Sequence, residues 1–183
     1  MEASEVSFGP DDHGTWRAIL EQQAPKRERQ LCDLYLRGFD LLAFGSDKIP
    51  DLQKVNQVLL TRSGFRGVYV QGLEDGKSFY QMLARREFPV GSFIRSRADL
   101  SYTPAPDVVH DLYGHLPFFT DRDYGDFCQA FGAAATEWVE QPHLFRQFER
   151  FFWFTIEFGL VMTKKGLRIF GAGIASSTKE CDY

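Results

Sequence analysis

The stretch Pro104-Ala-Pro-Asp-Val-Val-His-Asp-Leu-Tyr-Gly-His-Leu-Pro117 holds two of the four histidines of the chain, His110 and His115. Five residues turn a straight α-helix by about 500°, so the two imidazole rings would lie about 140° apart and could not both bind one metal ion. Gly114 is the residue type that commonly follows a helix end, and a proline three residues later opposes a restart. We therefore expect a short helix over residues 105–113 that ends at Gly114 and turns His115 back toward His110.

A third polar residue favours a metal site. Glu157 is the only charge in the run 151–160, which is otherwise almost wholly apolar. A helix that is apolar on all sides is buried, and a buried carboxylate needs a cation, a proton or a metal. Two histidines and one carboxylate with open positions are the ligand set of non-haem Fe(II) oxygenases. We expect His110, His115 and Glu157 to bind a metal; the alternatives are two structural histidines and a salt bridge from Glu157.

Three sequence motifs are informative when their order and spacing are taken together. They are Asp107-Val-Val-His-Asp-Leu-Tyr-Gly-His-Leu-Pro-Phe-Phe119, Trp153-Phe-Thr-Ile-Glu-Phe-Gly-Leu160 and Phe170-Gly-Ala-Gly-Ile-Ala-Ser-Ser177. In this order and spacing the chain resembles the pterin-dependent aromatic amino acid hydroxylases, which include the phenylalanine, tyrosine and tryptophan hydroxylases. Weaker similarity extends from about Trp16 to the C-terminus. Because family catalytic domains continue beyond the position of Tyr183, the resemblance implies a catalytic domain that is short at its C-terminus.

The resemblance implies a monooxygenase that hydroxylates the ring of an aromatic amino acid, with Phe as the first candidate and Tyr or Trp behind it. Fe(II) on His110, His115 and Glu157 would leave open positions for O₂. A tetrahydropterin similar to tetrahydrobiopterin would supply the two extra electrons that O₂ activation needs.

The resemblance also implies four pterin-binding residues. Phe79 matches the aromatic residue that stacks on the pterin, and Gly72 and Leu73 match the loop that lines the pterin pocket. Asp111 matches an acidic residue that helps to orient the pterin, although the family usually has the longer Glu there. A core position is the alternative for Phe79.

For the substrate, the resemblance implies that Arg95 receives the carboxylate of the amino acid. A guanidinium group suits this role because it binds a carboxylate through two parallel hydrogen bonds. A structural ion pair is the alternative for Arg95, and an ordinary core position is the alternative for Trp153. The other substrate-contact positions implied by the resemblance are Thr103, Pro106, Trp153, Phe158, Gly173, Ser176 and Ser177.

Three other functions compete with this interpretation. The shorter Asp111 and the short C-terminus leave open a repurposed Fe(II) oxygenase of specialised metabolism, which would act on a substrate derived from an aromatic amino acid without pterin. A non-catalytic binding protein on the same scaffold is the second alternative. Two histidines and a glutamate could also hold zinc in a hydrolase, but the sequence has no His-Glu-x-x-His motif.

Length and composition predict the domain organisation, the kinds of partner and the cellular location of the protein. The 183 residues predict a flexible tail over residues 1–10 and a single catalytic domain over residues 11–183. A net charge of −4 gives no electrostatic reason to bind nucleic acid or an anionic membrane. No apolar run has the length of a membrane span, and Cys32, Cys128 and Cys181 are scattered, so we expect a cytoplasmic protein. We expect a monomer or a dimer, because the 183 residues contain no counterpart of the family's tetramerisation part.

The spacing of apolar residues predicts a mainly α fold with a few short β-strands, an α+β class. We expect Pro25 to end the first helix and Ser78 to cap another. The expected helices cover 11–24, 26–44, 50–63, 79–86 and 105–113, and two longer ones begin near 120 and at 142. The expected strands or extended segments cover 65–72, 91–95 and 167–170. The helix that begins near 120 is expected to place Tyr124, Phe127, Phe131, Ala134 and Trp138 in the core.

Overall fold

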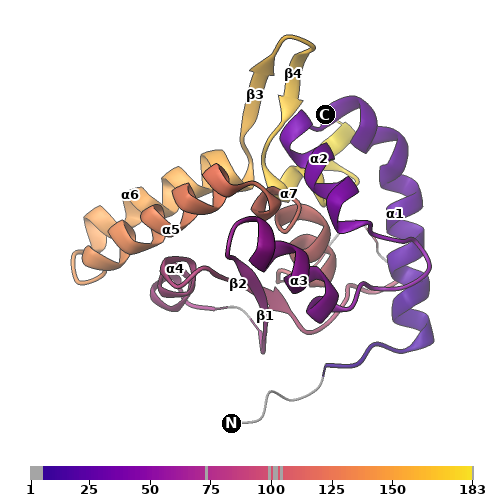
Figure 1. The fold of residues 1–183 in the computed structure, drawn as a ribbon, viewed down its shortest axis with the longest axis horizontal. Coiled ribbons are helices and arrows are strands. Elements are labelled where there is room, and N and C mark those ends of the chain that lie inside the picture. Colours follow the sequence, from indigo (N-terminus) through magenta and orange to yellow (C-terminus); the bar gives the residue numbers. More distant parts are fainter. Residues whose placement is uncertain (1–5, 73, 99, 101–102, 104, 183) are drawn as a thin grey trace.

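The computed structural model describes residues 6–72, 74–98, 100, 103 and 105–182. Within these ranges, helices make up most of the structure and are joined by two pairs of short strands (Figure 1), which confirms the predicted mainly α fold. Residues 1–5 of the expected tail and Leu73 lie outside the described residues, and Pro10 already belongs to the first helix. The division into a tail and one catalytic domain stays a prediction.

The first helix, α1 (Pro10–Gln30), continues through Pro25, so the expected end before this proline is wrong. A proline in a helix removes one backbone hydrogen bond, and contacts on both sides of it can hold the helix together. Gln23 donates a hydrogen bond to the Ala175 carbonyl (3.1 Å), and Gln30 donates one to the Cys181 carbonyl (2.8 Å). The contacts with the C-terminal segment therefore stabilise α1 across Pro25.

The helix is interrupted instead at Leu31 and Cys32, before α2 (Asp33–Leu42) begins. The Cys32 N–H donates to the Ile169 carbonyl at 3.0 Å, which ties this linker to the last strand of the chain. Backbone groups that bond to a strand cannot also bond within a helix. The expected helix over 26–44 is therefore divided between α1 and α2.

A parallel strand pair and the helix between its strands form one side of the site. Helix α3 (Leu52–Arg62) precedes β1 (Arg66–Val70), and α4 (Gly76–Ala84) connects β1 to β2 (Glu87–Gly91). The register runs from Arg66 opposite Glu87 to Val70 opposite Gly91. The second strand thus ends at Gly91, where the sequence predicted it to begin. The expected Ser78 cap is wrong, because Asp75 caps α4 by accepting a hydrogen bond from the Ser78 N–H at 2.9 Å.

The second half of the chain forms two projecting hairpins (Figure 1). One pairs α5 (Arg122–Glu137) with α6 (Pro142–Phe152), and the other pairs β3 (Leu160–Thr163) with β4 (Gly166–Ile169) in antiparallel register. The expectation of a buried apolar helix before Glu157 is wrong, because α6 has no buried residue and Phe154 is 70% exposed. On α5, Tyr124 is buried as expected, but Phe127 and Trp138 are exposed.

The core is centred on the segment that carries the histidines. The Tyr35 ring of α2 contacts Tyr113 and Phe118, with ring centroids 5.9 and 5.4 Å apart, and its hydroxyl donates to the Tyr113 carbonyl at 2.7 Å. A short 3₁₀-helix, η2 (Phe118–Thr120), follows this segment, and its Phe119 ring lies 4.4 Å from the Phe65 ring between centroids, at an interplanar angle of 33°. These aromatic contacts hold the histidine segment from both sides.

Candidate metal centre

His110 and His115 lie on the same face because the segment that carries them, η1 (Val109–His115), is a π-helix. The wider turn is seen where the Leu116 N–H donates to the carbonyl of Asp111, five residues earlier, at 3.0 Å. Residues five apart lie above one another in such a turn, whereas in an α-helix they do not. The two Nε2 atoms are therefore 3.1 Å apart.

The expected helix end at Gly114 is wrong, since η1 continues through this residue. The glycine has a packing role instead. A Cβ atom at position 114 would lie 2.9 Å from the Ala172 carbonyl oxygen and 3.2 Å from Ser176 Cβ. Gly114 therefore lets the short helix α7 (Ala172–Ala175) approach the backbone of η1.

Glu157 ends a second π-helical turn, η3 (Trp153–Glu157), in which the Phe158 N–H donates to the Trp153 carbonyl at 2.9 Å. The Glu157 carboxylate meets both histidines, with Oε1 3.3 Å from His110 Nε2 and Oε2 3.1 Å from His115 Nε2. Ligand atoms about 2.1 Å from a shared metal and at right angles to each other would be about 3 Å apart. The spacing of the three side chains therefore fits one metal ion held on one face.

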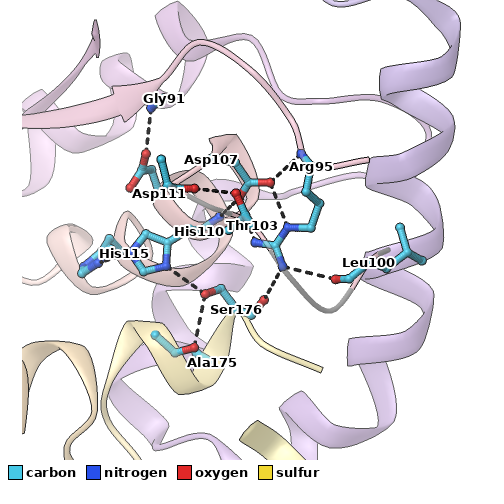
Figure 2. A network of polar contacts seen from close by, with 12 residues as sticks. Gly91, Arg95, Leu100, Thr103, Asp107, His110, Asp111, His115, Ala175 and Ser176 are labelled. Carbon is cyan, nitrogen blue, oxygen red and sulfur yellow. Dashed lines mark hydrogen bonds and ion pairs between the residues drawn. The ribbon is translucent and has the colours of Figure 1, made fainter. Parts of the chain in front are cut away.

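Two residues of the C-terminal segment position these ligands. Ser176 Oγ lies 3.1 Å from His110 Nδ1 (Figure 2), so it can accept a hydrogen bond from Nδ1–H in the tautomer that leaves Nε2 unprotonated for a metal. Gly173 lies beside Glu157, where a Cβ atom would be 2.7 Å from Oε1. Both residues were expected to contact substrate, and the structure brings them against the ligands.

Packing orients His115. Its Nδ1 atom is buried and has no hydrogen-bond partner within the described ranges. Its ring lies 4.6 Å from the Phe88 ring and 6.3 Å from the Phe152 ring, between centroids. Neither phenylalanine was predicted as a site residue, and the sequence around Phe88 carries no motif that could have indicated it.

The electrostatic environment favours the protonation states that a metal requires. Burial, more than any other cause, lowers the pKa of His110 to about 4, so its imidazole is neutral at pH 7. Burial also acts to raise the pKa of Glu157, but His115 and His110 outweigh it and bring this pKa down to about 2. Neutral imidazoles and an ionised carboxylate are the forms that bind cations.

Arg95 forms a buried ion pair with Asp107 (Figure 2). Its Nε and one terminal nitrogen each donate to Asp107 at 2.8 Å, and its other terminal nitrogen faces the carbonyls of Leu100 and Ser176 at 3.3 and 3.4 Å. Asp107 also accepts from the His110 N–H at 3.0 Å. The structure thus has the ion pair that was the alternative for Arg95, and the expected contact with a substrate carboxylate stays a prediction.

Asp111 is also buried, one helical turn after Asp107. Its Oδ2 atom accepts from the Gly91 N–H at 2.7 Å (Figure 2), and burial raises its pKa well above the ordinary value. This hydrogen bond joins the end of β2 to the histidine segment.

A pocket of about 480 Å³ opens beside the three ligands. The predicted site residues that line it are Gly72, Phe79, Pro106, His110, Asp111, His115, Trp153 and Glu157. Those that the structure places outside its lining are Arg95, Thr103, Phe158, Gly173, Ser176 and Ser177, and Leu73 is not among the described residues. The lining residues that sequence reasoning missed include Tyr80, Phe88, Glu149 and Phe152.

Two of the missed residues, Phe152 and Glu149, were missed for different reasons. Phe152 lies five residues before Glu157, and only the π-helical turn brings both to the same cavity. Glu149 stands on an exposed helix in which charges are frequent, so nothing in the sequence distinguishes it from a solvated residue.

The described helices are each too short or too polar to cross a bilayer.

Comparison with known proteins gives consistent matches. The family model for biopterin-dependent aromatic amino acid hydroxylases matches residues 1–183. Phenylalanine-4-hydroxylase of Chromobacterium violaceum is 35% identical over 96% of this chain and 59% of its own length. The enzyme of Caulobacter vibrioides is 38% identical over 92% of the chain and 57% of its own length. The chain therefore spans slightly less than three fifths of the length of these two relatives.

Solved structures agree with the sequence matches. The apo phenylalanine hydroxylase of Colwellia psychrerythraea superposes with a TM-score of 0.93 at 34% identity, over 100% of this chain and 69% of that one. The iron- and phenylalanine-bound enzyme of Chromobacterium violaceum superposes with a TM-score of 0.89 at 35% identity, over 96% of this chain and 63% of that one.

Proposed function

Because the chain belongs to the biopterin-dependent aromatic amino acid hydroxylases, we propose that it is a tetrahydropterin-dependent Fe(II) monooxygenase that hydroxylates the ring of an aromatic amino acid. Phenylalanine is the first candidate substrate, since the relatives from Chromobacterium violaceum and Caulobacter vibrioides are both phenylalanine-4-hydroxylases. The observation that carries the proposal is the convergence of His110, His115 and Glu157, whose ligand atoms all lie within 4.8 Å of one another.

In this proposal the three side chains hold Fe(II), and the bound iron with a tetrahydropterin supplies the activation of O₂. The neutral His110 and the ionised Glu157 are ready to bind the cation without first losing a proton. Ser176 keeps the Nδ1 proton of His110 directed away from the metal position.

The walls of the pocket suit an aromatic ring and a flat cofactor. Phe79, Phe88, Phe152 and Trp153 supply apolar surface that excludes water from the ligands. Phe79 is the proposed stacking partner of the pterin, with Gly72, Leu73 and Asp111 as its other contacts. The proposed substrate contacts are Arg95, Thr103, Pro106, Trp153, Phe158, Gly173, Ser176 and Ser177.

The family match favours this function over a pterin-free oxygenase. All three cysteines are free and buried, which supports the expected cytoplasmic location.

The first test measures metal binding and product formation separately. The purified chain is titrated with Fe(II) without oxygen, and then supplied with O₂ and Phe, Tyr or Trp, with and without a tetrahydropterin. We expect one iron per chain and a product heavier by one oxygen atom only when pterin is present. Turnover without pterin would contradict the cofactor, and unchanged iron binding in Glu157→Ala would contradict the ligand assignment.

A further inference from the structure

Glu149 brings a carboxylate of α6 to the pocket, away from the metal ligands. It lies on α6 three residues before Phe152, so both side chains project from the same face of that helix. The Phe152 ring contacts Phe79 of α4 at 5.1 Å and His115 at 6.3 Å, between centroids. Glu149 therefore lies about one helical turn beyond the aromatic layer that covers the ligands.

The Glu149 carboxylate faces the N-terminus of α4. A Cβ atom at Gly76, the first residue of α4, would be 3.1 Å from Glu149 Oε1. Tyr80, one turn further along α4, also lines the pocket, and burial and the charge of Glu149 both raise the pKa of its hydroxyl. Glu149 has no ion pair with any lysine or arginine in the part of the chain that the structure describes.

The ionisable groups around the pocket are acidic apart from the two histidines. The acidic lining residues are Glu74, Asp75, Asp111, Glu149 and Glu157. Burial raises the pKa of Asp111, and Glu157 belongs to the metal ligands, so the charge argument rests on Glu74, Asp75 and Glu149. Among the described lining residues there is no lysine or arginine that could offset their charge. Charges of one sign that line a cavity attract ligands of the opposite sign and repel ligands of the same sign.

We propose that Glu149 selects the pterin by its side chain, favouring an uncharged, hydroxyl-bearing side chain and disfavouring one that carries carboxylates. This inference rests on the proposed function, because it concerns the cofactor of the same pocket. A hydroxyl group can donate to the Glu149 carboxylate, whereas a carboxylate-bearing side chain, as in a reduced folate, meets a like charge there that no described lysine or arginine pairs with.

The test compares binding of three 7,8-dihydropterins to the purified full chain, by fluorescence or calorimetry. Dihydrobiopterin has a neutral hydroxylated side chain, dihydrofolate has a side chain that ends in glutamate, and 6-methyl-dihydropterin serves as a reference without either. Wild type is expected to bind dihydrobiopterin more tightly than dihydrofolate. Glu149→Gln should raise the relative affinity for dihydrofolate about fivefold, and Glu149→Lys about 20-fold.

Two controls distinguish an effect of the Glu149 charge from a loss of the fold or of the metal site. Glu137→Gln removes an exposed carboxylate at the end of α5, and it should leave the affinity ratio of the two pterins unchanged. Cobalt(II) titration and circular dichroism establish that each variant keeps the metal site and the fold. In wild type, added salt should reduce the preference, because salt screens exposed charges, and in Glu149→Gln this effect should be weaker.

The outcomes distinguish this inference from the proposed function. If dihydrobiopterin and 6-methyl-dihydropterin bind but the ratio to dihydrofolate is the same in wild type and Glu149→Lys, the role of Glu149 is wrong and the pterin-dependent function stands. If the chain binds none of the three, both the cofactor and the role of Glu149 are wrong.

Discussion

The ring of His110 is held in place by a single hydroxyl group. Ser176 Oγ is 3.1 Å from Nδ1, and Ser176 is 2% exposed, so water cannot easily replace it. Partners of this kind fix the tautomer of a ligand histidine, and their loss typically lowers metal affinity about 10- to 100-fold. Ser176→Ala should therefore weaken cobalt(II) binding about tenfold in an anaerobic titration.

Two further variants test whether the hydroxyl is responsible. Ser176→Thr keeps a hydroxyl group and should restore most of the affinity. Ser177→Ala removes the neighbouring hydroxyl, which accepts from the Glu180 N–H at 3.2 Å and does not touch the ligands, so it should bind cobalt as wild type does. Equal affinity in Ser176→Ala and Ser177→Ala would contradict the positioning role.

The depressed pKa of His110 predicts how the stability of the metal-free protein depends on pH. The folded protein keeps His110 neutral down to about pH 4, whereas the unfolded chain binds a proton at its ordinary value, about 6.5. Between these values the unfolded state binds more protons, so the free energy of unfolding should fall as pH falls from about 6.5 to 4. Urea unfolding at several pH values measures this slope. His110→Gln should have a shallower slope, and parallel profiles would contradict the shifted pKa.

At the scale of elements, the site depends on two π-helical turns. Each carries ligands at its end, His115 in η1 and Glu157 in η3. The sequence predicted the three ligand residues from their chemical types, and the structure brings those residues together. It could not predict the turns. The run 151–160 is almost wholly apolar and has no phase that an added residue could shift, and Gly114 is equally compatible with a helix end and with close packing.

The approach of α7 to η3 gives a prediction at this scale. Gly173→Ala would place a methyl group 2.7 Å from Glu157 Oε1, a distance that Cβ atoms rarely reach. Either the carboxylate or the backbone of α7 must move, so cobalt(II) affinity should fall about tenfold or more. Gly45→Ala is the matched control, because a Cβ atom there has nothing within 4 Å. If Gly173→Ala binds cobalt like Gly45→Ala, the carboxylate does not depend on this contact.

At the scale of the whole molecule, the sequence indicated the class of fold and the location of the core, but not the exposed parts. The run before Glu157 is apolar on all sides, yet Phe151, Trp153 and Phe154 are about half exposed or more. The spacing of apolar residues predicts which faces of a helix are apolar, but it does not indicate which other part of the protein covers those faces. Similarly, Pro25 gave a sound local reason to end a helix, and contacts with residues about 150 positions away overrode it.

The Arg95–Asp107 ion pair connects the loop before η1, the histidine segment and the C-terminal segment, so its loss should affect the whole fold. Asp107 is fully buried, and its removal leaves the Arg95 guanidinium buried without a counter-ion. Breaking such a pair from one side typically costs about 3–5 kcal/mol, whereas an exposed pair contributes about 1 kcal/mol or less. Asp107→Ala should therefore lower the free energy of urea unfolding by about 3 kcal/mol or more.

The exposed pair between Arg17 and Asp47, whose side chains are 52% and 92% exposed, supplies the control for that measurement. Asp47→Ala should lower the free energy of unfolding by about 1 kcal/mol at most. If the two variants lose equal stability, Arg95 does not depend on Asp107 and its guanidinium is free to bind a substrate carboxylate. If Asp107→Ala loses much more, as we expect, the Arg95 guanidinium depends on its buried counter-ion, and the proposed substrate contact falls to the terminal nitrogen that Asp107 does not bind.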